Sequence, residues 1–379
     1  MANKKKSSKS SKKKSPLVYG KEEVKFLETL LNTPSPTGFE YTGQQVWVDY
    51  IRPYVDDIII DTYGTAVGVI NPDAEYKVVI EAHCDEISRF VNYITDNGLI
   101  HVIRNGWSDH LIAPSQRVHI HTENDGTVDG VFGRPAIHTR GWSRSTKWET
   151  TPEVKNITID IWAADKKEVQ KLGIEIGNPI TYDAPFMTLN DKYFVARALD
   201  NRAGGFMIAQ VARLLQKNKK KLDFGLYIVN SVQEEIGLRW AKMIAERIQP
   251  DVAIVTDVRH DTTTPMIDKT VEWESKCGEW PMLTVWPAVQ NNLLRFVKKI
   301  AKKQKIDHQM WAASTYTGTD TDAFAYSNQG VASVLISLPL RYMHTTVEMV
   351  DQHDVSQTIK LMYETVCGLK KGQDFRYLK

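Results

Sequence analysis

Metal-ligating and proton-transferring side chains follow three apolar runs of the sequence, each where the run ends. The runs KVVIEA, LYIVNSV and VAIV have the composition of buried strands. The side chains that follow them are, in chain order, His83 and Asp85, then Glu234 and Glu235, then Asp257. In open α/β sheets, ligands bind beyond the carboxyl ends of the strands. The pattern therefore predicts that these three strand ends face one site.

Two more clusters supply groups of the same kind. Asp200 lies in ALDNR, just before an apolar helical pattern, and His344 ends RYMH, after the strand-like run 334–338. Two histidines and several carboxylates form the ligand set for a pair of divalent ions. Imidazole suits zinc, cobalt or nickel, and a carboxylate can bridge two ions.

Each of these residues also has a simpler interpretation. A strand-end aspartate such as Asp200 or Asp257 is often a helix cap or a turn residue. A lone histidine is often a hydrogen-bonded structural residue, and Glu234-Glu235 suits the start of a helix. The joint pattern favours a metal site. Adjacent glutamates at a strand-to-helix turn point in different directions, so one can bind metal while the other transfers a proton.

The chain changes texture twice, which predicts an α/β domain interrupted by an inserted module. Residues 89–184 contain short β-rich runs separated by Asn-Gly, Asp-Gly and Gly-Trp pairs, as expected for a small all-β module. Helical patterns alternate with apolar strands on both sides of it, which is α/β texture. The predicted catalytic domain therefore has two parts, 19–88 and 185–379.

The periodicity of apolar residues locates the individual elements. We expect helices at 21–31, 39–52, 202–216, 238–248, 291–304 and 354–369. We expect strands at 58–60, 66–70, 77–82, 224–231, 252–257 and 333–338.

Composition excludes several classes of protein. The 379 residues are 42% hydrophobic and 25% charged, which are ordinary values for a globular protein. No apolar run approaches the roughly 20 residues that span a bilayer, so no membrane association is expected. The three cysteines, Cys84, Cys277 and Cys367, are too few and too scattered for a disulfide scaffold. We expect a cytoplasmic protein.

The net charge of +2 conceals a basic N-terminus. The first fifteen residues hold seven lysines and no acid, and removing them from the 48 basic residues leaves 41 against 46 acidic residues. Residues 1–18 therefore read as a disordered basic tail. The body of the chain carries about −5, which argues against nucleic-acid binding by that part.

The clusters, in their order along the chain, also carry a family resemblance. The matching stretches are EAHCDEI, ARALDNRAGG, VQEEIGLRWA, TDV, TGTDTDAFAYSNQGV and ISLPLRYMHTTVEMVDQHDV. In these, the chain resembles the tetrahedral aminopeptidases of metallopeptidase family 42, which includes glutamyl and deblocking aminopeptidases. The resemblance extends from about residue 21 to the C-terminus and includes the inserted module.

The resemblance implies a role for each candidate residue. His83 and Asp257 would hold one metal, Glu235 and His344 the other, and Asp200 would bridge them. Glu234 would be the general base, and Asp85 would orient His83. The two ions would be zinc or cobalt.

The resemblance also implies a fold, an assembly and a reaction. The catalytic domain would have the zinc-exopeptidase fold, a mixed sheet flanked by helices, and the insert would be a small PDZ-like β-barrel for dimerisation. Dimers would build a hollow tetrahedral dodecamer that removes N-terminal residues from peptides. Three alternatives stay open: a carboxypeptidase or deacylase of the same architecture, an endoglucanase-type glycosidase that needs no metal, and a scaffold without activity.

Two residues depart from the family pattern. Arg89 follows a position where the family has glycine, so it either brings positive charge to the site entrance or pairs with an acid. Trp162 replaces a glycine near the end of the insert, where it either alters the substrate pocket or simply packs. Both bear on specificity, and neither removes a predicted ligand.

Overall fold

The computed structural model describes residues 16–123, 126–136, 138, 153–265 and 267–378. Residues 1–15 of the predicted basic tail lie outside this range. Among the described residues, no helix has the length and apolar character needed to cross a membrane.

An eight-stranded mixed sheet forms the centre of the larger domain. Its order is β1-β2-β12-β3-β13-β16-β14-β15, and the four middle strands run parallel. The middle strands are β12 (Gly225–Ser231), β3 (Lys77–His83), β13 (Val252–His260) and β16 (Ala332–Leu340). The outer strands are β1 (Asp57–Ile60), β2 (Ala66–Ile70), β14 (Met282–Val285) and β15 (Gln309–Ala312). The middle strands are apolar almost throughout because helices cover both faces of the sheet.

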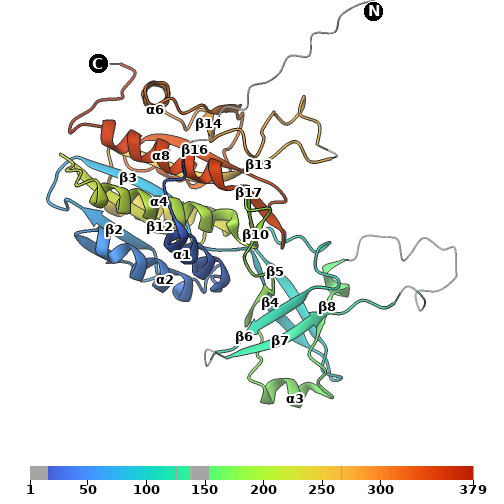
Figure 1. The fold of residues 1–379 in the computed structure, drawn as a ribbon. Coiled ribbons are helices and arrows are strands. Elements are labelled where there is room, and N and C mark those ends of the chain that lie inside the picture. The colour runs from blue at the N-terminus through green and yellow to red at the C-terminus, as the bar shows by residue number, and fades with distance from the viewer. Residues whose placement is uncertain (1–15, 124–125, 137, 139–152, 266, 379) are drawn as a thin grey trace, which may run out of the picture.

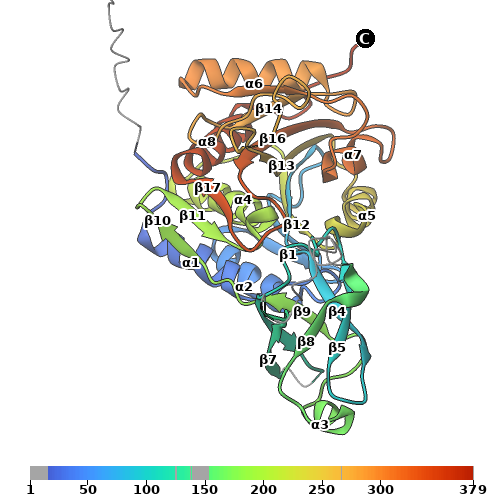
Figure 2. The ribbon, with the colours of Figure 1, turned by 90° about the vertical axis from the view of Figure 1, so that its right-hand side faces the viewer.

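The helices lie in two groups, one on each face of the sheet (Figure 2). The first group is α1 (Lys21–Asn32), α2 (Tyr41–Ile51), α4 (Leu199–Lys217), α6 (Asn291–Gln304) and α8 (Gln352–Gly368). The second group is α5 (Arg239–Ile248) and α7 (Asp320–Ala325). Helix α4 is buried along nearly its whole length, which fixes its first turn firmly against the sheet. The sequence predicted all of these helices except α7.

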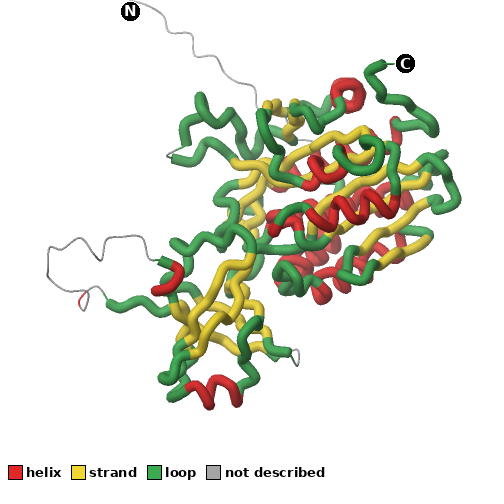
Figure 3. The backbone as a smooth tube through the Cα atoms, turned by 180° about the vertical axis from the view of Figure 1, so that it is seen from behind, coloured by secondary structure: helices red, strands yellow, loops and turns green. Residues whose placement is uncertain are grey.

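The predicted insert forms a closed barrel of six antiparallel strands that projects from the larger domain (Figures 1 and 3). Its strands are β4 (Ser88–Ile94), β5 (Ile100–Asn105), β6 (Arg117–His121), β7 (Thr127–Phe132), β8 (Thr158–Asp160) and β9 (Pro179–Tyr182). The barrel has a separate apolar core. The predicted fold class, a mixed α/β sheet with an inserted β-barrel, is confirmed.

The expectation of an all-β insert was wrong in one element. Helix α3 (Lys166–Lys171) follows β8 and packs Val169 into the barrel core. Its start is fixed by Asp165, whose side chain accepts a hydrogen bond from the Glu168 N–H at 2.9 Å. A helix of six residues is too short to give a clear apolar period, so the β-rich surroundings dominated the prediction.

The positions of Arg89 and Trp162 differ from both interpretations that the sequence offered for each. The buried Arg89 guanidinium donates to the Asp109 carbonyl at 2.9 Å and lies against Phe132, all within the inserted module. Trp162 is 92% exposed, so it neither packs nor reaches a pocket described here. The arginine therefore stabilises the barrel, and the tryptophan stands on its outer surface.

A small sheet of three strands joins the segment before α4 to the segment before α8. It consists of β10 (Met187–Leu189), β11 (Tyr193–Ala196) and β17 (Glu348–Asp351). The pairing of β11 with β17 places Ala196 opposite Glu348. The chain that leads into α4 is thereby held beside the chain that leads into α8.

Candidate metal centre

All seven predicted site residues lie at the carboxyl edge of the parallel strands. His83 is the last residue of β3, and Asp257 lies in the adjacent β13. The two glutamates form the short 3-10 helix η5 (Glu234–Ile236), which follows β12. Asp200 lies in the first turn of α4, and His344 follows β16. The parallel register that sequence reasoning assumed is therefore the arrangement that gathers them.

Asp200 stands between the two histidines and points one carboxylate oxygen at each. Its Oδ1 lies 3.2 Å from His83 Nε2, and its Oδ2 lies 3.2 Å from His344 Nε2. Asp257 Oδ1 lies 3.8 Å from His83 Nε2, and Glu235 Oε2 lies 3.4 Å from His344 Nε2. The ligating atoms thus form two groups of three that share Asp200.

The donor set fits two divalent ions. Four nitrogen or oxygen ligands at about 2.0–2.1 Å from a tetrahedral ion lie roughly 3.3 Å from one another. The separations between each histidine and its two carboxylates, 3.2–3.8 Å, are close to that value. Glu235 Oε1 is buried and has no hydrogen-bond partner among the described residues, as expected of an atom placed for a cation.

In the protein alone, the acidic groups of the site outnumber its basic groups. Burial raises the pKa of Asp257, and burial with the nearby Asp320 and Asp257 charges raises the pKa of Glu234 above its usual range. Burial alone lowers the pKa of His344, but its hydrogen bonds with Asp200 and Glu235 outweigh this and raise the pKa to about 12. The site therefore binds excess protons unless other cations neutralise its carboxylates.

Asp85 contacts more residues of the site than the sequence predicted. Its Oδ1 lies 3.3 Å from His83 Nδ1 and accepts the Glu234 N–H at 3.0 Å. Its Oδ2 accepts the Glu235 N–H at 3.2 Å and the Thr37 hydroxyl at 2.8 Å. One fully buried carboxylate therefore orients a histidine and fixes the backbone of both glutamates.

Glu348 is a site residue that sequence reasoning missed. Its Oε1 accepts the His344 N–H at 2.7 Å, and its Oε2 accepts the Asp200 N–H at 3.0 Å. The side chain is 2% exposed, and burial raises its pKa well above the usual range. It fixes the backbone of two candidate ligands that are far apart in sequence. The sequence holds no signal for this, because the contact depends on the pairing of β11 with β17.

The candidate ligands line a cavity of about 310 Å³. Trp107, Arg259 and Met343 extend its wall beyond the ligands and Glu234. Trp107 comes from the inserted module, between β5 and β6. The size suits one residue or the end of a short peptide.

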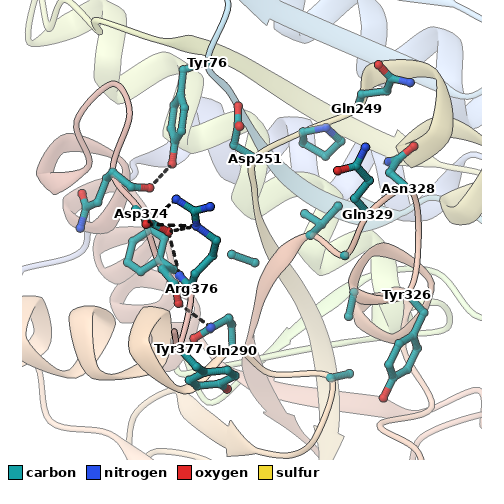
Figure 4. A pocket seen from close by; sticks show the side chains of 18 of the residues that line it. Tyr76, Gln249, Asp251, Gln290, Tyr326, Asn328, Gln329, Asp374, Arg376 and Tyr377 are labelled. Atoms are coloured by element: carbon teal, nitrogen blue, oxygen red, sulfur yellow. Dashed lines mark hydrogen bonds and ion pairs between the residues drawn. The ribbon is translucent and has the colours of Figure 1, made fainter. Parts of the chain in front are cut away.

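A larger cavity, about 940 Å³, lies at the opposite edge of the sheet, where Asp251 precedes β13 (Figure 4). Tyr76 donates to the Gln373 carbonyl at 2.7 Å there, and Arg376 pairs with Asp374. Neither metal-ligating group of the described residues lies in it. Its place at the amino ends of the parallel strands is also opposite to where such sheets bind ligands.

Comparisons with known proteins agree on one family. The model of the M42 glutamyl aminopeptidase family matches residues 64–361. A lysyl aminopeptidase of Pyrococcus furiosus is 31% identical over 338 residues, which cover 88% of this chain and 94% of that protein. A glutamyl aminopeptidase of Lactococcus lactis is 28% identical, over 74% of this chain and 78% of that protein.

Two solved structures show the same architecture. A TET aminopeptidase from a marine sediment thaumarchaeote superposes with a TM-score of 0.87 at 26% identity, covering 92% of this chain and 97% of that one. The TET1 peptidase of Pyrococcus horikoshii, which can assemble into a tetrahedron or a large octahedral shell, gives a TM-score of 0.78 at 25% identity. The alignment with the TET1 peptidase covers 90% of this chain and 98% of that one.

Proposed function

Because the chain belongs to the M42 glutamyl aminopeptidase family, we propose that the cluster around Asp200 is the di-metal centre with which it removes N-terminal residues from peptides. The family establishes a metal-dependent aminopeptidase, and the proposal concerns which residues perform each step. The observation that carries it is Asp200, whose two oxygens each lie 3.2 Å from a different histidine.

Each of the two groups would hold one ion. His83 and Asp257 would bind the first, Glu235 and His344 would bind the second, and Asp200 belongs to both groups. The mixed imidazole and carboxylate donors support zinc or cobalt. Two divalent ions bound there would polarise the scissile carbonyl and lower the pKa of the attacking water.

Glu234 is the general base in this proposal. It is not needed as a ligand in either group of three, and its Oε2 lies 3.9 Å from His83 Nε2, at the side of the cavity. A carboxylate beside the ligands that is not itself needed as one suits a group that takes a proton from water. It then delivers that proton to the departing amine. Asp85 fixes the backbone N–H groups of Glu234 and Glu235, so base and ligand keep a constant spacing.

Self-association supplies the second part of the proposal. We assign residues 19–88 and 185–379 to catalysis and the insert, 89–184, to dimerisation. The support is the projecting barrel and the likeness to TET peptidases that assemble into closed shells. A tetrahedral dodecamer would enclose the active sites, so peptides would be the substrates rather than folded proteins. The cytoplasmic location stays a prediction from the sequence.

Release of free amino acids from a mixed peptide pool tests the proposal. The pool is incubated with added zinc or cobalt, with a chelator, and as N-acetylated copies of the same peptides. Stepwise release that needs metal and is abolished by acetylation is the expected result. Release that persists after acetylation indicates a carboxypeptidase or deacylase, and release that needs no metal overturns the assignment of the site. No release with either metal favours the glycosidase or the scaffold alternative. Glu234→Gln is the matched control, because it keeps the shape of the side chain while removing the base.

A further inference from the structure

Two arginines flank the candidate bridging ligand along the chain. Arg197 lies three residues before Asp200, and Arg202 lies two residues after it, in the first turns of α4. Both guanidinium groups pair with the same carboxylate, that of Glu86. Glu86 follows His83, the last residue of β3, by three residues. This group of three side chains, which we call the Glu86 cluster (Glu86, Arg197 and Arg202), therefore joins two segments that each carry a candidate ligand.

The contacts of the Glu86 cluster reach three elements of the larger domain. Arg202 Nη2 donates to Glu86 Oε1 at 2.6 Å, and Arg202 Nε donates to the Cys84 carbonyl at 3.4 Å, directly after β3. Arg202 Nη1 donates to the Leu30 carbonyl at 2.8 Å, near the end of α1. Arg197 Nη1 donates to the other Glu86 oxygen, Oε2. One guanidinium thus holds the start of α4 against both the end of β3 and the end of α1.

Burial makes the geometry of the Glu86 cluster strict. All three side chains are buried. Burial alone raises the pKa of Glu86, but the charges of Arg197 and Arg202 outweigh this and lower the pKa below its usual value. The carboxylate therefore stays ionised, and moving one member away leaves a buried charge without its partner, which is costly. The cluster consequently allows few relative positions of the segments that it joins.

The backbone before Asp200 needs such support. Ala198 has a φ of 58° and a ψ of 27°, a left-handed conformation. A residue with a Cβ adopts this conformation only where the surrounding contacts hold it. Glu348 accepts the Asp200 N–H at 3.0 Å, and the Glu86 cluster holds the residues on both sides. Loss of the cluster would let this segment relax and carry Asp200 with it.

We propose that the Glu86 cluster positions Asp200 relative to His83 and thereby sets the spacing of the two ions. The inference rests on the proposed function and adds to it positioning residues that touch neither ion nor substrate. Asp200 belongs to both ligand groups, whereas every other ligand belongs to one. The first ion to bind can draw a displaced Asp200 toward itself, so the displacement should weaken the second ion more than the first.

The test titrates cobalt into the metal-free full-length protein and resolves the two binding steps by calorimetry. Glu86→Gln keeps the shape of the side chain. Its amide oxygen can still accept from Arg202 and the Ser35 N–H, while its nitrogen takes the place of Oε2 and faces Arg197. We expect the affinity for the second ion to fall by about 10- to 100-fold and the affinity for the first to change less. Electron paramagnetic resonance of the cobalt-loaded protein should show weaker coupling between the two spins, because that coupling depends on the bridge.

Three further variants separate positioning from stability. Arg197→Gln leaves the contact between Glu86 and Arg202 in place, so the test does not depend on whether Glu86→Gln folds. It should weaken the second ion in the same direction. Arg197→Lys, which restores the charge, should recover part of that affinity. Glu23→Gln is the matched control, because it removes an ion pair of α4 with α1 further along α4, where Arg213 Nη1 lies 3.3 Å from Glu23 Oε1. Both cobalt affinities of this control should equal those of the wild type.

The outcomes separate this inference from the proposed function. Wild-type affinity for the second ion in folded Glu86→Gln or Arg197→Gln overturns the positioning role. A variant that unfolds at lower urea without metal, yet keeps both affinities and the spin coupling, also overturns it, because that indicates a purely structural role. Fewer than two cobalt ions bound per chain of the wild type would instead overturn the proposed function, and this result needs no variant.

Discussion

The substitution Asp85→Asn tests whether one buried carboxylate positions His83, Glu234 and Glu235. Each of its oxygens serves two groups: Oδ1 faces His83 and the Glu234 N–H, while Oδ2 faces the Glu235 N–H and the Thr37 hydroxyl. An asparagine has the same shape but replaces one acceptor with an NH₂ donor. The amide nitrogen must therefore meet at least one backbone N–H, whichever way the side chain turns.

The structure indicates which orientation costs least. The Thr37 hydroxyl also lies 3.2 Å from the Glu86 carbonyl, so it can donate there instead and accept from the new amide. The amide nitrogen then occupies the place of Oδ2, and the Glu235 N–H loses its partner. A buried unpaired N–H costs about 1–3 kcal/mol, and loss of the charge weakens the remaining bonds. We expect the free energy of unfolding to fall by roughly 2–4 kcal/mol.

Metal affinity tests the role of Asp85 more directly than stability does. Loss of a group that orients ligands typically weakens metal binding by roughly 10- to 100-fold. Competition with a chromophoric chelator measures this affinity, and kcat at saturating metal measures what added metal cannot restore. We expect kcat to stay low, because Asp85 also positions the backbone of Glu234.

The control is Asp49→Asn, an exposed carboxylate that accepts from Gln45 on α2. It should leave affinity, stability and kcat unchanged. Wild-type metal affinity in Asp85→Asn would refute the reasoning, because its contacts with His83 and Glu235 would then be dispensable.

Four other changes test separate parts of the site. Glu234→Gln should lower kcat by about 10²–10⁴-fold while the metal content, measured by atomic absorption, stays at the wild-type level. Glu348→Gln should weaken metal binding about tenfold in the same chelator competition and change kcat less than Glu234→Gln does. Burial and the Asp85 charge raise the pKa of Glu40 to about 8. The folded metal-free protein therefore keeps this carboxyl protonated, and its free energy of unfolding falls as pH rises from about 5 through 8. In urea unfolding, the stability of Glu40→Gln relative to the wild type should increase over that range. Because the pKa values of Glu234 and Asp257 are raised, metal must displace protons, and the melting-temperature increase on adding zinc should grow as pH rises from 5 toward 8.

The sequence could locate the ligands because their signal is local. An apolar run marks each strand, and the polar group after it marks the carboxyl edge, so His83 and Asp257 needed only the assumption that β3 and β13 are parallel neighbours. Glu348 had no such signal, since its contacts with His344 and Asp200 arise from a register between distant segments.

The inserted barrel belongs to the site although it supplies none of the proposed ligands. It begins at Ser88, five residues after His83, and the Asn105 side chain at the end of β5 donates to the Thr37 carbonyl at 2.8 Å. Gly106 follows with a φ of 70°, and a side chain there would meet Glu235 Cβ at 3.3 Å, so the barrel backbone packs directly on the turn that carries the glutamates. The next residue, Trp107, is 78% exposed and lines the cavity. Contacts that fix the barrel relative to the sheet therefore also fix one wall of the cavity. We therefore expect substrate choice to depend on this module as well as on the residues of the candidate metal centre.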